Sequence, residues 1–363
     1  MVGDGGSRHR SRGWRIAVAT ALLALACGGD RALATDPEPD GDVLWSLLAV
    51  GDTGGDATPW LPNSLQRVTA GLDAVARTRP VDAVVLLGDN FYPSGLERHE
   101  LAARVRMNVV APLCRFADLS APRSPEVEDA CAILVAERRP VPIFAVLGNH
   151  DYRTDASPSL QIHAVPEFVA NWEMPEDTIR VHAVAPGVSL VLFHSMPMVQ
   201  NGEDVVALER ALRDAPGPWR ILAAHHPVLA TKGDHNELED RHLTLAREAI
   251  RAAGVPVQLA LGGHHHSLQL LVDEAPAMPV QVVSGSGSRS PEAVVGQPGL
   301  RFASQRSGFA RIDLVERDGE QRLVVSFYST RSPWLPPAAP HLEARWSVDR
   351  GGLAHEVIPG PVP

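Results

Sequence analysis

The sequence predicts an α/β protein whose strands are buried between layers of helices. Short apolar runs recur from Val43 onward, and longer stretches with helical spacing separate several of them. Strands that alternate with helices form sheets covered on both faces, so they read as nearly continuous apolar runs. At 363 residues, the chain can bury a substantial core. A hydrophobic content of 45% and a charged content of 21% are typical of a globular protein.

The expected strands are short apolar runs, and the expected helices are longer amphipathic stretches with few helix breakers. The strands are Val43–Val50, Val81–Leu87, Val141–Leu147, Val188–Phe193, Arg220–Ala224, Val257–Leu261, Val280–Ser284, Ala310–Val315 and Leu323–Phe327. The helices are Ser64–Arg79, Leu96–Val110, Asp204–Asp214 and Leu238–Ala253.

The first 34 residues are interpreted as an export signal. Several arginines up to Arg15 precede an uncharged run from Ile16 to Ala26, which is too short to span a bilayer. The residues before Cys27 resemble a bacterial lipoprotein signal that ends at residue 26, so that Cys27 could carry a lipid. Ordinary cleavage after Ala26 or Ala34 is the alternative. We therefore expect an exported protein that is periplasmic, a cell-surface lipoprotein or secreted.

The remaining chain divides by composition. Residues 35–42 are a linker, residues 43–331 are the main domain, and the tail 332–363, proline-rich early and late, is expected to be irregular. Residues 113–139 carry no motif and are interpreted as a peripheral insert. Its Cys114 and Cys131 could form a disulfide in an oxidising compartment, or remain two buried thiols.

The net charge of −10 argues against nucleic acid or an anionic membrane surface as the main partner. Contact with a membrane is therefore expected only through a lipid on Cys27. The sequence does not predict the oligomeric state.

Five of the expected strands are followed at once by residues that can bind a metal. Each motif alone is weak evidence for a metal site, since Gly-Asp after a strand is usually a turn or a helix cap. Five such motifs at strand ends are hard to obtain by chance. The motifs are Gly51-Asp52-Thr53-Gly54, Gly88-Asp89-Asn90-Phe91-Tyr92, Gly148-Asn149-His150-Asp151, His225-His226 and Gly263-His264-His265-His266.

The donors in these motifs are carboxylates, an amide, imidazoles and the phenol of Tyr92, which could instead be a core aromatic. Mixed oxygen and imidazole donors suit iron, zinc or manganese better than calcium or magnesium. The donors are too many for one ion. Two ions that share a carboxylate are the economical interpretation.

The ordered motif set resembles that of the calcineurin-like metallophosphoesterases over about residues 44–330. Tyr92 narrows the resemblance to the purple acid phosphatases, and the stretch from Gly263 to Gln269 is similar to their small animal-type and bacterial branch. The resemblance implies a four-layer α/β/β/α sandwich with a dimetal site at the C-terminal ends of the strands.

The same resemblance implies the metal ligands. Asp52, Asp89, Tyr92 and His266 would hold an Fe(III) ion. Asp89, Asn149, His225 and His264 would hold a divalent ion, which could be iron, zinc or manganese. Asp89 would then bridge the two ions, and His265 would point away from them.

Three histidines are catalytic candidates by the same analogy. His150 would sit beside the bound phosphate as a general acid or transition-state donor; orienting Asp52 or Asp151 is its alternative role. A further histidine facing the substrate is matched only approximately by His235, with His226 as a competing candidate. The family commonly has an aspartate after Phe193, where this chain has His194 and Ser195.

The implied activity is hydrolysis of small phosphomonoesters by a metal-bound hydroxide, as in an acid phosphatase. A phosphodiesterase or nucleotidase on the same scaffold is the nearest alternative. A surface lipoprotein that keeps the fold for binding, and a protein whose metals are only structural, are the other two.

Overall fold

The computed structural model describes residues 38–55, 64–131, 137–229, 237–273, 278–289, 291–292, 294, 296–330 and 340–360. The export signal, Cys27 and His235 lie outside the described residues. The chain divides into the units Met1–Thr35 and Asp36–Pro363, and the second unit is the subject below. Among the helices described, none combines the length and the apolar character needed to cross a membrane.

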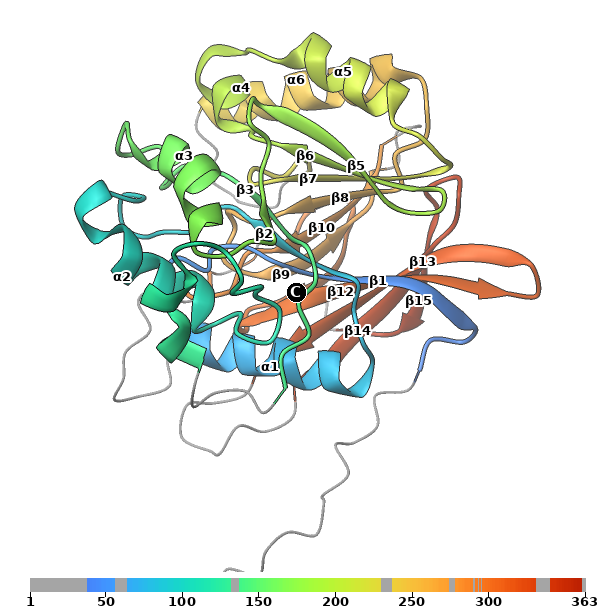
Figure 1. Ribbon diagram of the computed structural model, residues 1–363. Helices are drawn as coiled ribbons and strands as arrows, with labels where there is room; N and C mark the ends of the chain where they lie inside the picture. The colour runs from blue at the N-terminus through green and yellow to red at the C-terminus, as the bar shows by residue number, and fades with distance from the viewer. Residues whose placement is uncertain are drawn as a thin grey trace, which may run out of the picture. The chain divides into compact units, whose positions relative to one another are not determined.

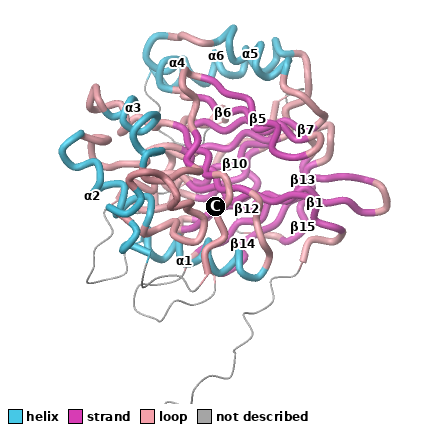
Figure 2. The backbone as a smooth tube through the Cα atoms, viewed as in Figure 1, coloured by secondary structure: helices cyan, strands magenta, loops and turns pink. Residues whose placement is uncertain are grey.

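Two β-sheets form the centre of this unit (Figures 1 and 2). The eight-stranded sheet has the order β15-β14-β13-β12-β1-β2-β3-β4, and the seven-stranded sheet has the order β11-β9-β10-β8-β7-β6-β5. The strands of the first are β1 Asp42–Val50, β2 Ala83–Leu87, β3 Ile143–Val146, β4 Trp172–Glu173, β12 Gly308–Arg317, β13 Glu320–Ser329, β14 His341–Val348 and β15 Ala354–Ile358. Those of the second are β5 Ile179–Ala185, β6 Val188–Phe193, β7 Trp219–Ala224, β8 Leu259–Gly262, β9 Leu268–Leu271, β10 Val280–Ser284 and β11 Leu300–Ser304.

The longer helices bury one apolar stripe each against the sheets. In α1 (Ser64–Thr78) the buried residues include Leu65, Val68, Leu72 and Val75, which recur at helical spacing. The other helices are α2 Leu101–Val105, α3 Ser157–Ser159, α4 Met196–Asn201, α5 Val205–Asp214 and α6 Glu237–Ala253. The expected helix over residues 96–110 is split into a 3₁₀ turn, α2 and a π turn at Arg106–Val110.

Three apolar clusters confirm the predicted four-layer α/β/β/α sandwich. One lies between the eight-stranded sheet and α1, one between the two sheets, and one between the seven-stranded sheet and α4, α5 and α6. Figure 1 shows α4, α5 and α6 over the sheet that contains β6 and β7, with α1 on the opposite side. The middle cluster holds both sheets together, and its residues include Leu47, Val85 and Leu190.

Each sheet contains a run of parallel strands. β1, β2, β3 and β4 are parallel in one sheet, and β6, β7, β8 and β10 are parallel in the other. The carboxyl ends of such strands meet at one edge of a sheet, where sites form. All five motifs follow strands of these two runs, which explains how the fold can bring them together.

The prediction that the C-terminal tail is irregular is wrong for its middle part, because β14 and β15 extend the eight-stranded sheet. β14 pairs antiparallel with β13, and its Ala344, Trp346 and Val348 are buried between the sheets. The prolines at both ends of the tail indicated irregular structure, so the short alternation of apolar residues between them was not predicted as a strand. The shorter strands β4, β5, β9 and β11 were not expected either.

In its described residues the insert has little regular structure, and a disulfide joins its Cys114 and Cys131. The pairing confirms one of the two alternatives for these cysteines. Two 3₁₀ turns, Ser124–Glu126 and Glu128–Cys131, lie within this loop. The disulfide limits how far residues 114 and 131 can separate in the unfolded chain.

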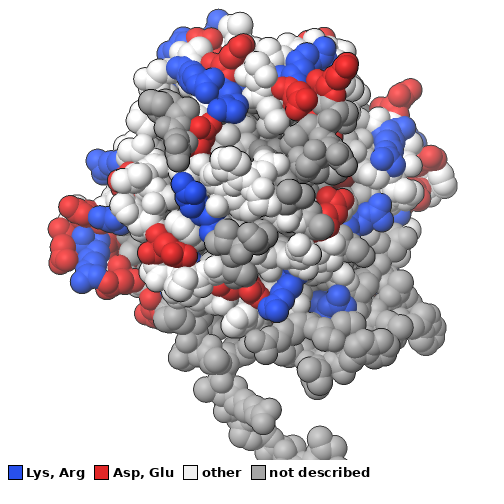
Figure 3. Space-filling view, turned by 180° about the vertical axis from the view of Figure 1, so that it is seen from behind, with Lys and Arg blue, Asp and Glu red and all other residues white. Residues whose placement is uncertain are grey.

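Acidic and basic side chains are mixed on the face that Figure 3 shows. The described residues include exposed ion pairs, such as Arg106 with Asp129 at 2.8 Å. Pairs of this kind contribute little to stability.

Candidate metal centre

Six of the seven predicted ligands come from the ends of five strands. Asp52, Asp89 and Asn149 follow β1, β2 and β3 of the eight-stranded sheet. His225 and His264 follow β7 and β8 of the other sheet, and His266 precedes β9. The structure brings both sets together, so that the site lies where the two sheets present their carboxyl ends to each other.

The backbone at these strand ends adopts unusual conformations. Asp52, Asp89 and His264 have positive φ values of 59°, 53° and 65°. Such values are rare for residues other than glycine and cluster at functional sites. Gly148 allows a close approach, because a Cβ there would lie 2.3 Å from both the amide nitrogen and Oδ1 of Asp89.

Tyr92, Asp52 and His266 form one half of the site. The Tyr92 hydroxyl donates to Asp52 Oδ1 at 2.9 Å, and His266 Nε2 lies 3.4 Å from the same carboxylate oxygen and 3.4 Å from the hydroxyl oxygen. Asp52 is fully buried and Tyr92 is 4% exposed. Three of the four groups predicted to hold the first ion therefore converge on one point.

Asn149, His225 and His264 form the other half, and Asp89 lies next to them. Asn149 Oδ1 is 3.0 Å from His225 Nε2 and 3.2 Å from His264 Nδ1. Asp89 Oδ1 is 3.6 Å from His225 Nε2. Ligand atoms of Asp52, Asp89 and His225 all lie within 4.8 Å of one another, which places Asp89 in reach of both halves.

Each of the three histidines predicted as ligands has a partner on the ring nitrogen that points away from the site. His225 Nδ1 donates to the Leu87 carbonyl at 2.8 Å, His264 Nε2 faces Glu239 Oε1 at 3.3 Å, and His266 Nδ1 faces Glu292 Oε1 at 3.3 Å. These contacts fix the tautomers and direct one lone pair of each ring into the site. Such outer partners orient metal-binding histidines and raise their basicity.

This arrangement fits a pair of cations. With the tautomers fixed, the lone pairs of His225 Nε2 and His264 Nδ1 face an amide oxygen that is also an acceptor. Acceptors that face one another in a buried site need a cation between them. The donor set of carboxylates, amide oxygen, imidazoles and phenol suits borderline transition metals.

Electrostatics of the protein alone keep Tyr92 protonated. Burial and the charges of Asp52 and Asp89 raise the pKa of Tyr92 far above its usual range. Burial acts to raise the pKa of Asp52, but the hydrogen bond with His266 and the nearby histidines lower it overall. Only a strong cation could stabilise the phenolate of Tyr92 in this position.

Asp151 joins the loops that carry two of the ligands. Its carboxylate accepts hydrogen bonds from the amides of Gly148 at 2.8 Å, Asn90 at 3.1 Å and Phe91 at 3.1 Å, and it is fully buried. Asp151 thus connects the Asp89 loop with the Asn149 loop. The sequence placed this residue in a motif but gave it no role of its own.

His150 lies beside the Asp89 carboxylate, with its Nε2 atom 4.0 Å from Asp89 Oδ2. Its Nδ1 atom donates to the Pro93 carbonyl at 2.6 Å, so Nε2 accepts from Arg153 Nη2 at 3.0 Å. The guanidinium of Arg289 lies 4.1 Å from the centre of the Tyr92 ring, which in turn packs edge-on against His150 at 4.5 Å. The sequence did not indicate a role for Arg153 or Arg289, because neither belongs to a motif.

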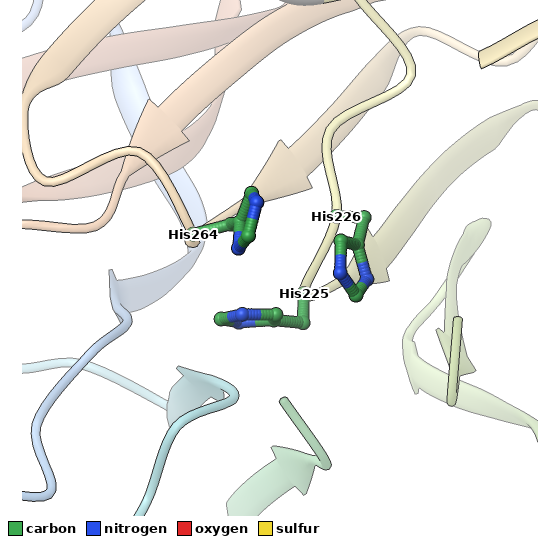
Figure 4. Close-up of side chains that lie close together, drawn as sticks. All are labelled: His225, His226 and His264. Carbon is green, nitrogen blue, oxygen red and sulfur yellow. The ribbon is translucent and has the colours of Figure 1, made fainter. Parts of the chain in front are cut away.

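His226 is buried behind the ligands. It is 4% exposed, and its Nδ1 atom lies 2.8 Å from Ser195 Oγ. Figure 4 shows it beside His225 and His264, and ligand atoms of the three rings lie within 4.8 Å of one another. His265 is also buried, at 4% exposure.

His194 occupies the position after Phe193 where the family that the sequence resembles commonly has an aspartate. Its Nδ1 atom accepts from the Leu147 amide at 3.1 Å, and its Nε2 atom donates to the Pro175 carbonyl at 3.2 Å. Leu147 precedes Gly148 and Asn149, so the ring supports the loop of one ligand. Ser195 contacts His226, as described above.

The buried ring of His194 is expected to make the fold less stable in acid. Burial lowers the pKa of His194 to about 4, although the Pro175 carbonyl acts to raise it. Since its pKa falls on folding from an ordinary 6.5, the unfolded chain takes up the proton first. Stability is therefore lost as pH falls from about 6.5 to about 4, by up to about 3 kcal/mol.

Urea unfolding at several pH values checks this expectation. His194→Asn keeps an acceptor for the Leu147 amide but cannot take up a proton, so its unfolding free energy should depend less on pH over that window. His99→Asn changes an exposed histidine and serves as the matched control. Equal pH slopes for wild type and His194→Asn would show that this histidine does not contribute.

The fold and the site together define a class: hydrolases that bind two metal ions between two sheets and act on phosphoesters. The chain belongs to the calcineurin-like phosphoesterase family, whose model matches residues 46–268. Its similarity to curated relatives marks it as a purple acid phosphatase-like member. Membership of this family implies that the cluster of Asp and His side chains is a dinuclear metal centre.

Two of these relatives come from Arabidopsis thaliana. Purple acid phosphatase 4 is 27% identical over 293 residues, which are 74% of this chain and 76% of the relative. Purple acid phosphatase 17 is 25% identical over 333 residues, which are 84% of this chain and 87% of the relative.

Solved structures share the fold at low sequence identity. PhoD matches with a TM-score of 0.58 at 10% identity, over 90% of this chain and 74% of PhoD. GAP50, described as the anchor in the inner membrane complex of Plasmodium, matches with a TM-score of 0.54 at 14% identity, over 88% of this chain and 90% of that chain.

Proposed function

We propose that this protein is an exported purple acid phosphatase of the small animal-type and bacterial branch that hydrolyses small phosphomonoesters. The observation that carries the proposal is the position of Tyr92, whose hydroxyl oxygen meets Asp52 and His266 in the buried half of the site. A phenolate is a ligand suited to a trivalent ion, and phosphoesterases of the wider family do not need one.

In this proposal the candidate ligands divide between two ions as the family resemblance implies. Asp52, Asp89, Tyr92 and His266 would hold Fe(III), and Asp89, Asn149, His225 and His264 would hold a divalent iron, zinc or manganese ion. Two such ions, when bound, polarise a phosphoryl oxygen and lower the pKa of water.

His150 and Arg153 would bind the phosphate and the leaving group from the open side. His150 is half-buried beside Asp89, and Arg153 is exposed. Arg153 brings a positive charge and a planar fork of donors suited to phosphate. A general-acid role for His150 requires its Nε2 atom to carry a proton, which Arg153 opposes by donating to that atom.

His226 and His235 remain candidates for contact with the substrate. The buried ring of His226 is bound to Ser195, which favours a role in positioning the neighbouring ligand histidines. His235 follows β7 by a short stretch, but it lies outside the described residues.

Substrate specificity tests the proposal. Purified holoprotein should hydrolyse p-nitrophenyl phosphate with a much higher kcat/KM than bis(p-nitrophenyl) phosphate, and it should do so in acid. Nucleotides would serve as a third substrate class. A preference for the diester or for nucleotides would replace the monoester assignment with a phosphodiesterase or nucleotidase.

Tyr92→Phe is expected to bleach the protein while leaving part of the activity. A phenolate bound to Fe(III) absorbs visible light by charge transfer, so the wild-type holoprotein should be pink to purple. The Phe variant removes the phenol oxygen and keeps the ring that packs against His150. Tyr152→Phe is the matched control, since Tyr152 lies outside the ligand set. An iron-loaded wild type without colour would refute the ferric tyrosinate.

A further inference from the structure

We propose that a third divalent cation binds beside the dinuclear centre, held by His226, Glu239 and His242. None of these three residues belongs to the ligand set of the dinuclear centre. The proposal concerns a separate site, which the chain could have with or without the phosphatase activity.

A small cavity marks this site. It has a volume of about 10 Å³ and lies between the loop after β7, the loop after β8 and helix α6. That volume is about what one water molecule or one ion occupies. The polar residues that line it are His226, Glu239, His242, His264 and His265. One carboxylate with several imidazoles is a donor set typical of zinc.

His242 is the residue that points to a ligand. It lies on the buried face of α6 and is 1% exposed, in company with Ala246, Ala249 and Ile250. Neither of its ring nitrogens makes a hydrogen bond of normal geometry within the described part of the chain. The carbonyls of His226 and Pro227 lie close enough to raise the pKa of the ring, but neither contact has the geometry of a hydrogen bond. Burying an imidazole without hydrogen bonds costs folding free energy, and a bound metal ion would give one of its nitrogens a partner.

His226 is oriented to share an ion with His242. Its Nδ1 atom lies against Ser195 Oγ at 2.8 Å, so Nε2 remains to serve as the ligand atom. The ring centres of His226 and His242 are 5.5 Å apart. Two imidazoles on one tetrahedral zinc, with Zn–N of about 2.1 Å, hold their ring centres about 5 Å apart. The observed spacing therefore suits a shared ion.

Glu239 supplies the negative charge and connects the two sites. It lies one turn before His242 on α6, and its Oε1 atom faces His264 Nε2 at 3.3 Å. His264 turns its other nitrogen toward Asn149 in the dinuclear centre. An ion held by Glu239 would thus fix α6 against the end of β7 and hold the ring of His264 in place.

Metal analysis of the purified holoprotein tests the proposal. After growth with zinc chloride and removal of loosely bound ions, wild type should carry three metal ions per chain. Glu239→Gln, which keeps an acceptor for His264, and His242→Leu, which places an apolar residue on the buried face of α6, should carry two. Asp89→Ala should keep one. His182→Asn changes a partly buried histidine outside this cluster and should keep all three.

The outcomes separate this site from the proposed phosphatase. Two ions per chain in wild type, or three in His242→Leu, would overturn the third site whatever the activity. If His242→Leu carries two ions and keeps its turnover of p-nitrophenyl phosphate within about 3-fold of wild type, the third ion is distinct from the catalytic pair. Three ions in an inactive wild type would support this site and refute the phosphatase.

Discussion

Replacing Asp89 with alanine is expected to remove both ions of the dinuclear centre and to lower kcat/KM by at least about 10³-fold. The two ions are expected to stabilise the transition state by several kcal/mol, and each 1.36 kcal/mol corresponds to a factor of ten. Asp89 is 2% exposed, and its carboxylate lies beside His225 on one side and near Asp52 on the other. Without Asp89, both halves of the metal site lose the negative charge that they share.

The measurement is elemental analysis of the purified variant together with its turnover of p-nitrophenyl phosphate. Asp129→Ala removes an exposed aspartate paired with Arg106 and is the matched control. An Asp89→Ala protein that still holds both ions of the pair would refute the bridging role. Circular dichroism should show an intact fold, because Asp89 lies in a loop after β2 and not in the apolar core.

The candidate ligands could be proposed from the sequence because most of them lie in a short motif soon after a buried strand. Asp52, Asp89 and Asn149 needed only the sequence around them, and the parallel sheet places strand ends together. The order of the motifs then supplied the family. Local sequence was enough, since the backbone geometry that positions each ligand is set within a few residues.

The partners behind the ligands could not be predicted. Glu239 lies 25 residues from His264, and Glu292 lies on a loop with no motif. Their roles arise from the packing of α6 and the loop after β10, which periodicity does not determine. His194 was noticed only as a departure, and its contact with the Leu147 amide depends on how β3 lies against β6. Side-chain pairs between distant segments need coordinates.

The limits of the fold prediction have a similar cause. Strands with continuous apolar runs, such as β2 and β6, were found close to their observed bounds. Strand β5 was missed because it is only partly buried and carries Arg180 and His182. Strands β14 and β15 were missed because prolines on both sides indicated a tail. Burial of Ala344, Trp346 and Val348 between the two sheets, and not local propensity, makes β14 a strand, and β15 pairs with it.

Asp151→Ala is expected to destabilise the protein more than any change to a ligand. The carboxylate accepts three backbone hydrogen bonds in a fully buried position, from Gly148, Asn90 and Phe91. Each buried donor left without a partner costs about 1–3 kcal/mol, so loss of the three hydrogen bonds should lower the unfolding free energy by at least about 3 kcal/mol. The loops of Asp89 and Asn149 would also separate, and metal affinity should fall with stability.

Urea unfolding of the metal-free and metal-loaded protein distinguishes these two effects. Asp151→Asn keeps one carbonyl oxygen and should lose less stability than Asp151→Ala, which gives a graded series at one position. Asp177→Ala, at an exposed site, is the control. If Asp151→Ala unfolds within about 1 kcal/mol of wild type in the metal-free state, the three hydrogen bonds do not hold the loops together. In that case the ions would have to hold the loops of Asp89 and Asn149 together.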